Sequence, residues 1–236
     1  MDCAAHGITD VGRRRRENQD SFRIVEESGF FTVADGMGGM RNGALASKYA
    51  VNVLCELINR EIDDEVDAEK ISLIVKDAII ELSDLLQSAI GKHTGTTIVL
   101  ALIKDDNAVI AHMGDSRAYL FRDDNLLRLT EDHNLFALLR KTKRFTDEEL
   151  REDKTHHMLI RYVGMDNARP DVKIVSINKG DRLLLCTDGL SEMVKDDEMA
   201  EIMRGAQRPE VALERLVARA NKAGGDDNIT AVIVEC

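Results

Sequence analysis

Apolar residues recur along this chain with two different spacings, one typical of helices and one typical of strands. From Ala46 to Ile58 and from Ile71 to Leu86 they recur every three or four residues, as on a helix with one buried face. An acidic linker, Glu61 to Glu69, separates these two predicted helices. Their apolar stripes are expected to belong to the core rather than to a cofactor site. A second pair of helices is predicted at Glu192 to Arg204 and at Pro209 to Ala223.

Short apolar runs bounded by turn residues predict the strands. The four runs between Thr97 and Leu129, separated by turns such as Asp105-Asp106-Asn107, are expected to form an antiparallel meander. Because runs of strands are followed by runs of helices, a parallel βαβ sheet is disfavoured. We therefore predict an α+β fold, a four-layer α-β-β-α sandwich of two antiparallel sheets flanked by helix pairs. The predicted strands are Cys3–Thr9, Ser21–Val25, Phe30–Asp35, Thr97–Ile103, Ala108–Met113, Arg117–Phe121, Leu126–Leu129, Val172–Ile177, Arg182–Cys186 and Ile229–Val234.

Residues 131–164 differ from the rest of the chain because they are polar, rich in charge and without a clear period. Basic residues such as Arg140 and Lys143 stand there beside the acidic run Asp147-Glu148-Glu149. A long irregular segment inside a compact domain is usually a functional lid or an insertion. We predict that it forms a small helical flap on a single domain of residues 1–236, since one core is the default up to roughly 250 residues.

The composition is that of a soluble globular protein, with 44% hydrophobic and 32% charged residues. A net charge of −11 argues against general binding of nucleic acids or acidic membranes. No apolar run approaches the roughly 20 residues that a membrane-spanning helix needs. The chain opens on Met1-Asp2 without a signal sequence, and its cysteines show no CxxC pair, so a reducing cytoplasm is the expected location. The cysteines are Cys3, Cys55, Cys186 and Cys236.

Four aspartates share one context, because each borders a predicted strand and has a glycine beside it or close by. They are Asp35, Asp115, Asp188 and Asp227. A single residue of this kind is typical of a turn or a cap, since aspartate and glycine are common turn residues. Four in one domain are harder to explain in this way, because strand ends of a sandwich can converge on one rim. Carboxylates gathered there would repel one another unless cations lay between them.

A run of four arginines, Arg13 to Arg16, leaves two interpretations open. On the first, the run is a solvated surface or a nonspecific anion patch, which is the usual meaning of clustered charge. On the second, one of these side chains binds a phosphate group. The planar guanidinium keeps its charge and matches phosphate oxygens, so arginine is better suited to that task than lysine.

The donor types near the four aspartates indicate which cation would fit. Oxygen ligands, without histidine or cysteine, favour a hard ion such as Mg²⁺ or Mn²⁺ over zinc. A glycine such as Gly36, next to Asp35, lets the backbone approach an ion and offer its carbonyl group. Two ions roughly 3.5–4 Å apart would activate a water molecule and stabilise the attacking and leaving oxygens in an in-line displacement at phosphorus. Together with an arginine on the phosphate, this set indicates hydrolysis of a phosphate ester.

These residues resemble the ordered motifs of the metal-dependent protein serine/threonine phosphatases of the PPM, or PP2C, family. The resemblance extends over nearly the whole chain, and the Gly-Met-Gly-Gly form is similar to the bacterial branch. It implies a β-sandwich flanked by helices and a binuclear Mn²⁺ or Mg²⁺ centre that dephosphorylates phosphoserine and phosphothreonine through metal-activated water. The matching segments are Arg15-x-x-Asn18-Gln19-Asp20, Asp35-Gly36-Met37-Gly38-Gly39, Gly114-Asp115-Ser116-Arg117, Asp188-Gly189 and Asp227-Asn228-Ile229-Thr230.

By position, the resemblance implies a role for each acid of the metal centre. Asp35 would bridge the two ions, and Gly36 would give its carbonyl group to one of them. Asp188 and Asp227 would complete the main site. Asp115 matches an acid that, in bacterial members, helps to hold a third and weaker ion together with Asp188.

The resemblance also implies roles outside the main metal site. Arg15 matches the phosphate-binding arginine, and Asp20 matches an acid near the metals that contacts them directly or through water. The expected partners are phosphorylated proteins, the substrates of a Ser/Thr kinase, with no nucleic acid. The chain is expected to be a monomer.

Two segments depart from the family pattern. Where this chain has Met37, eukaryotic relatives have a histidine that is proposed as the general acid. The leaving alkoxide must therefore take its proton from another group, and a metal-bound water is the expected source. The segment Lys141 to Thr146 stands near the place where a Gly-x-Ile-Thr element is common. This second departure bears on substrate preference rather than on the chemistry.

Other readings of the sequence are weaker. The glycine loop after Asp35 lacks the closing glycine of a dinucleotide-binding G-x-G-x-x-G fingerprint. Cys186 has no arginine six residues later, which disfavours a cysteine phosphatase. His156-His157, His112 and His133 are expected to be surface or structural residues, with a smaller chance that His133 contacts substrate or water. A metal-dependent docking module without activity is disfavoured because every family aspartate is present.

Overall fold

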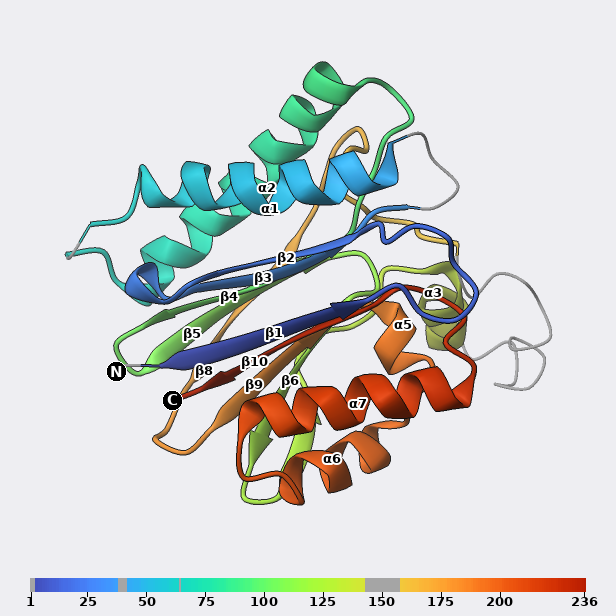
Figure 1. The fold of residues 1–236 in the computed structure, drawn as a ribbon. Helices are drawn as coiled ribbons and strands as arrows, with labels where there is room; N and C mark the ends of the chain where they lie inside the picture. Colours follow the sequence, from blue (N-terminus) through green and yellow to red (C-terminus); the bar gives the residue numbers. More distant parts are fainter. Residues whose placement is uncertain (1–2, 38–41, 64, 143–157) are drawn as a thin grey trace.

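Two five-stranded antiparallel sheets pack face to face in the computed structural model, which describes residues 3–37, 42–63, 65–142 and 158–236 (Figure 1). The first sheet has the order β1 (Ala4–Asp10), β10 (Ile229–Glu235), β9 (Arg182–Cys186), β6 (Arg117–Arg122) and β7 (Asn125–Arg128). The second has the order β2 (Asp20–Val25), β3 (Phe30–Asp35), β4 (Ile98–Lys104), β5 (Asn107–Met113) and β8 (Asp171–Ser176).

Helices cover the outer face of each sheet, as Figure 1 shows. The long helices α1 (Gly43–Asn59) and α2 (Ala68–Ile90) lie over the second sheet, and α6 (Asp196–Arg204) and α7 (Pro209–Ala223) lie over the first. The layers are therefore α-β-β-α, and the predicted fold class is confirmed. Short helices complete the described elements: η1 (Glu26–Ser28), α3 (Leu135–Thr142) and α5 (Asp188–Ser191).

The core consists of three apolar layers, one between the sheets and one under each helix pair. Strand β3 shows how one strand serves two of them: Phe30 and Ala34 pack toward the helices, whereas Phe31 and Val33 pack between the sheets. Strands buried on both faces read as continuous apolar runs rather than alternating ones. This explains why the strand positions were predictable from the sequence.

The prediction of one meander between Thr97 and Leu129 is wrong. Strands β4 and β5 pair in the second sheet, whereas β6 and β7 pair in the first, so the chain crosses between sheets at Gly114 to Ser116. Gly114 has a φ of +120°, and a Cβ there would lie 2.6 Å from the Cβ of Thr97. Because β5 and β6 are both buried on two faces, the apolar pattern could not show that they belong to different sheets.

The helix predicted from Glu192 to Arg204 is shorter than expected. Residues Asp188 to Ser191 form α5, and a separate helix α6 begins only at Asp196. Lys195 has extended backbone angles, and Asp196, Asp197 and Glu198 form the acidic first turn of α6. Acidic residues stabilise a helix N-terminus by interacting with its macrodipole. By contrast, α7 has the predicted bounds.

Part of the predicted flap can be located. Helix α3 lies within it, and the amide of Leu135 donates to the carbonyl oxygen of Met158 at 2.9 Å, which joins the two described ends of the segment. The predicted histidine pair His156-His157 and the stretch from Lys143 to Thr146 lie outside the described residues, as do Gly38 and Gly39.

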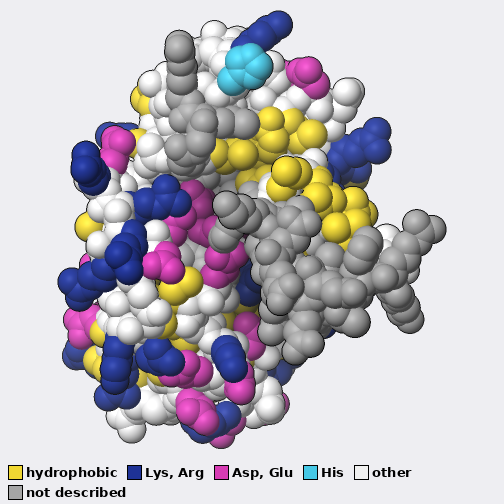
Figure 2. All heavy atoms as spheres, turned by 90° about the vertical axis from the view of Figure 1, so that its right-hand side faces the viewer, with side chains coloured by type: hydrophobic (Ala, Val, Ile, Leu, Met, Phe, Trp, Pro, Cys, Tyr) yellow, Lys and Arg dark blue, Asp and Glu magenta, His cyan; other side chains and the backbone are white. Residues whose placement is uncertain are grey.

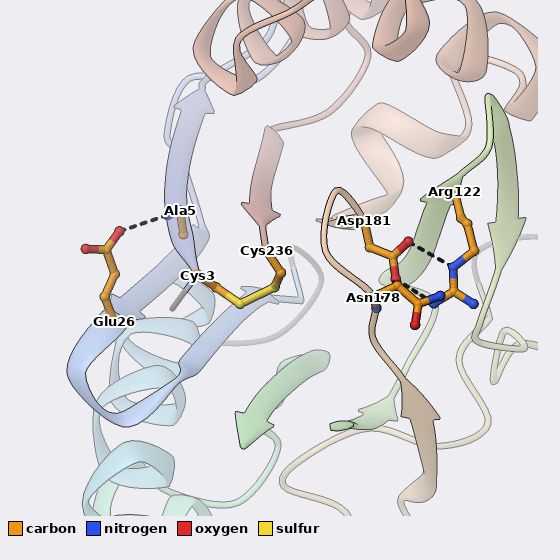
Figure 3. The surroundings of a disulfide bond; sticks show 7 residues. All are labelled: Cys3, Ala5, Glu26, Arg122, Asn178, Asp181 and Cys236. Carbon is orange, nitrogen blue, oxygen red and sulfur yellow. Dashed lines mark hydrogen bonds and ion pairs between the residues drawn. A yellow bond between two sulfur atoms is a disulfide. The ribbon is translucent and has the colours of Figure 1, made fainter. Parts of the chain in front are cut away.

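A disulfide joins Cys3 to Cys236, at the neighbouring ends of β1 and β10 (Figure 3). The antiparallel register, which places Ala4 opposite Glu235, brings these cysteines together. Sequence spacing could not reveal this pair, because the two residues are 233 positions apart. Disulfides are rare in reducing compartments, so the bond does not support the expected reducing cytoplasm. Among the described helices, none is long and apolar enough to cross a membrane.

Candidate metal centre

The four predicted aspartates come together at one rim of the sandwich. Asp35 ends β3, Asp115 follows β5 after one residue, Asp188 follows β9, and Asp227 precedes β10. Figure 2 looks onto this end of the molecule and shows acidic side chains gathered in the middle of the face. They line a cleft of about 420 Å³. The predicted residues that line it are Arg15, Asp35, Gly36, Asp115, Asp188 and Asp227.

The backbone of Asp35 is fixed by two threonines at the start of β4. The Asp35 amide donates to Thr97 Oγ1 at 2.9 Å, and the Thr97 amide donates to the Asp35 carbonyl oxygen at 2.8 Å. Thr96 Oγ1 also donates to that carbonyl oxygen, at 2.7 Å. The neighbouring strand thus holds the main chain of Asp35 while its carboxyl group lines the cleft.

Gly36 stands where the end of β3 passes close to the start of α1. A Cβ at this position would collide with the carbonyl oxygen of Gly43 and would lie 2.7 Å from that of Gln19. The Gly36 amide donates to the same Gln19 oxygen at 3.0 Å. Glycine is therefore required here by the close approach of the Gly43 and Gln19 backbone, whereas the approach of the Gly36 carbonyl group to an ion stays a prediction.

Asp20 lies beside the cleft, at the start of β2 opposite Asp35. Thr187 Oγ1 donates to Asp20 Oδ2 at 2.9 Å, whereas Asp20 Oδ1 is buried and has no hydrogen-bond partner among the described residues. A buried carboxylate oxygen without a partner is costly, and a cation or an ordered water would satisfy it.

Arg15 is the member of the arginine run that enters the cleft. Its Nη2 donates to Asp227 Oδ2 at 2.6 Å, and Asp227 Oδ1 accepts a bond of 2.8 Å from the amide of Asn228. Arg14 forms an exposed ion pair of 3.6 Å with Asp226 instead. Of the two interpretations of the run, a specific role therefore fits Arg15, and a solvated surface fits Arg14.

Asn228 organises the loop that carries the arginines, a role that the sequence analysis did not assign. This residue is buried, with 4% of its surface exposed. Nδ2 donates to the carbonyl oxygens of Val11 and Glu17, both at 2.9 Å, and Oδ1 accepts from the Gln19 amide at 2.8 Å. One side chain thus ties both ends of the loop to the start of β10, next to Asp227. Its place in a turn sequence gave no sign of these long-range bonds.

The electrostatics of the cleft favour a bound cation. Burial, together with the neighbouring carboxylates, raises the pKa of Asp35 and of Asp115 well above the usual range. Burial also raises the pKa of Asp20 to about 7, with smaller contributions from Asp188 and Asp227. Groups in this situation bind protons unless another cation compensates their charge. The donors are oxygens throughout, so the residues present fit Mg²⁺ or Mn²⁺.

His112, His133 and Asp171 form a second group whose ligand atoms lie within 4.8 Å of one another. His133 Nδ1 accepts a bond of 3.2 Å from the Gly114 amide, so the proton of the neutral ring lies on Nε2, which is 3.0 Å from Asp171 Oδ2. An ion on Nε2 would have to displace that proton. Burial, assisted by His112, lowers the pKa of His133 to about 4, so the ring stays neutral. We interpret this group as structural, with His133 holding Gly114 beside Asp115.

Several residues of the cleft were not predicted. Glu192, Met193 and Leu159 line it together with the predicted acids. Leu159 comes from the described end of the flap, and the first two follow α5. The sequence around these three residues is typical of an ordinary helix or loop, so their place in the cleft can be recognised only from the folded structure. Met37 does line the cleft, at the place where the sequence analysis noted a missing histidine.

Comparison with known sequences gives a consistent result. The family model for "Protein phosphatase 2C" matches residues 12–230. A serine/threonine phosphatase, stp, from Listeria innocua is 35% identical over 236 aligned residues, which cover 96% of this chain and 93% of that protein. The protein phosphatase PhpP of Streptococcus pneumoniae is 35% identical over 233 residues, with coverage of 96% and 95%.

Solved structures resemble the chain over its whole length. The serine/threonine phosphatase of S. agalactiae has a TM-score of 0.88 at 31% identity, and the match covers 99% of each chain. The catalytic domain of the serine/threonine protein phosphatase PstP, solved in complex with two manganese ions, has a TM-score of 0.81 at 29% identity, with coverage of 99% and 97%.

Proposed function

The chain belongs to the protein phosphatase 2C family, and from this membership we propose that the carboxylate cleft is the catalytic centre of a protein serine/threonine phosphatase. The protein is a metal-dependent enzyme that hydrolyses phosphoserine and phosphothreonine in proteins, with Mn²⁺ or Mg²⁺ as cofactor. The observation that supports the proposed site most strongly is the meeting of Asp35, Asp115, Asp188 and Asp227 at one rim, with Arg15 beside them.

The residues that would hold the ions are assigned from their positions in the family motifs and from their place in the cleft. We assign Asp35 as the bridge between two ions, the Gly36 carbonyl group as a backbone ligand, and Asp188 and Asp227 as the remaining carboxylates of the main site. Asp115, with Asp188, would hold a third and weaker ion. Asp20 would contact the centre directly or through water. When bound, two such ions activate a water molecule for attack on phosphorus and offset the negative charge of the phosphate.

Arg15 would bind and orient the phosphate group. Its guanidinium presents five N–H donors, and only Nη2 is used in the bond to Asp227. That bond fixes the side chain at the edge of the cleft, while the other donors can contact phosphate oxygens. Asn228 acts one step further away, because it holds the loop from which Arg15 projects.

The leaving group must obtain its proton without help from Met37. The thioether of Met37 lines the cleft and has no acidic proton to give. We propose that water in the cleft protonates the serine or threonine oxygen as the phosphate departs. The side chain of Met37 would then serve to limit the space beside the reacting phosphate.

We propose that the substrates are proteins phosphorylated by a Ser/Thr kinase and that the chain acts as a monomer. We also propose that it is one phosphatase domain, since β1 and β10, near its two ends, are neighbours in one sheet.

Hydrolysis of p-nitrophenyl phosphate and of a phosphothreonine peptide tests the proposed function. Both reactions should require added Mn²⁺ or Mg²⁺ and stop with EDTA, and Asp35→Ala or Asp188→Ala should abolish them. Full activity of either variant would contradict the assignment of the metal centre. Metal-dependent binding of the peptide without turnover would instead indicate a docking module.

A further inference from the structure

A second groove opens directly beside the cleft. It has a volume of about 700 Å³ and lies between α3 and the segment that joins α5 to α6. Glu192 and Met193 line both the groove and the cleft, so the two spaces adjoin at these residues. A polypeptide whose phosphorylated residue enters the cleft could therefore extend along this groove.

The floor of the groove has more positive than negative charge. Arg117 donates to both oxygens of Asp132, at 3.0 and 2.8 Å, and Arg128 donates to Oδ1 of the same carboxylate. Two guanidinium groups thus share one carboxylate, and these three residues keep one unit of positive charge. This surplus of positive charge makes the groove suited to a further anionic group.

The walls of the groove add exposed basic side chains. Arg140 and Lys141 lie in the last turn of α3, and Lys195 lies before α6 on the other side. Lys141 pairs with Glu131 at 2.9 Å. Among the described residues, the lining contains five basic and three acidic ones, although the whole chain has a net charge of −11. The groove is thus a local basic site at the edge of an acidic cleft.

We propose that this groove binds acidic side chains of the protein substrate that flank its phosphoserine or phosphothreonine, an inference that rests on the proposed function. The carboxylates of aspartate or glutamate match the planar guanidinium groups in charge and geometry. The groove is open to solvent, so each contact contributes modestly, and the preference weakens as salt screens the charges. A nucleic acid fits less well, because its continuous negative charge would also face the acidic cleft and an acidic protein.

Peptide pairs test this proposal. Two phosphothreonine peptides of equal length, one with glutamate and the other with glutamine at the flanking positions, are hydrolysed with Mn²⁺, and the ratio of their kcat/KM values is measured. p-Nitrophenyl phosphate, which is too small to occupy the groove, serves as the reference activity. The unaltered protein should prefer the glutamate peptide by about 5-fold or more at low salt, and the ratio should fall toward one at high salt.

Charge reversal in the groove should remove the preference. The double substitution Arg140→Glu/Lys195→Glu should lower the ratio to about one or below. Lys195→Glu alone, at an exposed residue outside the flap, should lower it partly and serves if the double variant folds poorly. The matched control is Lys179→Glu, which makes the same charge change as Lys195→Glu in an exposed turn. This turn is far from the cleft, because the amide of the next residue, Gly180, donates to the carbonyl oxygen of Cys236, whereas Asp227 lies at the other end of β10.

Equal hydrolysis of the two peptides by the unaltered protein would overturn the proposal, and so would a kcat/KM ratio that the double substitution leaves unchanged. The same loss of preference in Lys179→Glu would also overturn it. A fourth contrary result would be inhibition of glutamate-peptide hydrolysis by a single-stranded oligonucleotide at equal concentration. A protein that hydrolyses neither the peptides nor p-nitrophenyl phosphate in Mn²⁺ would contradict the proposed function itself and with it this inference. Turnover of p-nitrophenyl phosphate without peptide preference separates the two cases.

Discussion

At the scale of single residues, the cleft depends on a few long-range contacts that set the direction of each functional group. Arg15 and Asp227 are far apart in the sequence but are joined by a bond of 2.6 Å. Asn228 fixes the loop that brings them together. The threonines at the start of β4 hold the backbone of Asp35 in the same way.

Arg15→Ala should raise KM for a phosphopeptide while changing kcat less, because a contact to the phosphate that exists in ground and transition states is lost. A charge-assisted bond of this kind contributes about 1.5–3 kcal/mol, which corresponds to roughly a 10- to 150-fold effect. Steady-state kinetics at saturating Mn²⁺ measure it. The control is Arg16→Ala, at the exposed neighbouring arginine, which should keep KM near that of the unaltered protein. An unchanged KM in Arg15→Ala would assign the phosphate to another group.

Asn228→Ala should destabilise the fold and raise KM together. It removes three hydrogen bonds from a buried position and leaves two carbonyl oxygens and one amide to find other partners. We expect the free energy of unfolding to fall by about 2–4 kcal/mol, as measured by urea denaturation. Asn228→Asp, which keeps only the acceptor oxygen, should be impaired as well. A variant with normal stability and normal KM would show that the arginine loop holds its shape without this side chain.

At the scale of elements, the sequence predicts most of the fold because helices with one buried face and doubly buried strands have distinct apolar patterns. The bounds of α7 and the position of β3 follow directly from these patterns. The assignment of strands to sheets does not, since β5 and β6 look alike in sequence but lie in different sheets. The disulfide also depends on strand register, which residue spacing does not show.

The candidate site is predictable to a similar extent. A glycine-flanked acid at a strand end indicates each of Asp35, Asp115 and Asp188, and the resemblance to the family adds Arg15 and Asp20. The cleft residues Glu192 and Leu159 and the anchor Asn228 could not be assigned, because their roles arise from contacts between distant segments. The groove between α3 and the α5–α6 segment could not be predicted for the same reason, since distant segments form its two sides.

The crossing between sheets at Gly114 supplies a prediction at this scale. Gly114→Ala should lower stability by about 1–3 kcal/mol and weaken Mn²⁺ binding, because a Cβ would press on Thr97 and displace Asp115. Gly91→Ala is a matched control, since Gly91 has the same φ of +120° but no atom within 4 Å of the added Cβ. The control should lose stability from backbone strain while keeping its affinity for Mn²⁺. Equal behaviour of the two variants would contradict a specific role for this crossing.

At the scale of the whole molecule, the candidate metal centre depends on how the two sheets pack together. Asp35 comes from the second sheet, Asp188 and Asp227 border strands of the first, and Asp115 lies on the crossing between them. The cleft therefore requires both sheets to be packed together. The disulfide lies at the opposite end of β1 and β10 and ties together residues near the two ends of the chain (Figure 3).

The disulfide should affect stability more than activity. Cys3→Ser should lower the free energy of unfolding by about 2–5 kcal/mol, since the bond closes a very long loop in the unfolded chain. The effect is measured as the midpoint of thermal unfolding in the presence and absence of dithiothreitol. The control is Cys55→Ser, at a free buried cysteine, in which dithiothreitol should still lower the unfolding midpoint. Activity at room temperature should persist in Cys3→Ser. An unfolding midpoint that ignores both the substitution and the reductant would contradict this prediction.

The most direct test of the metal centre is a calorimetric titration of the metal-free protein with Mn²⁺ near pH 6, in two buffers of different ionisation enthalpy. Because burial and the neighbouring carboxylates raise the pKa of Asp35 and of Asp115, we expect the metal-free cleft to hold protons that Mn²⁺ binding releases. We predict at least two ions per chain with net proton release, and an affinity at least roughly tenfold weaker in Asp35→Asn. Absence of Mn²⁺ binding, or unchanged binding of two ions by Asp35→Asn, would contradict the account.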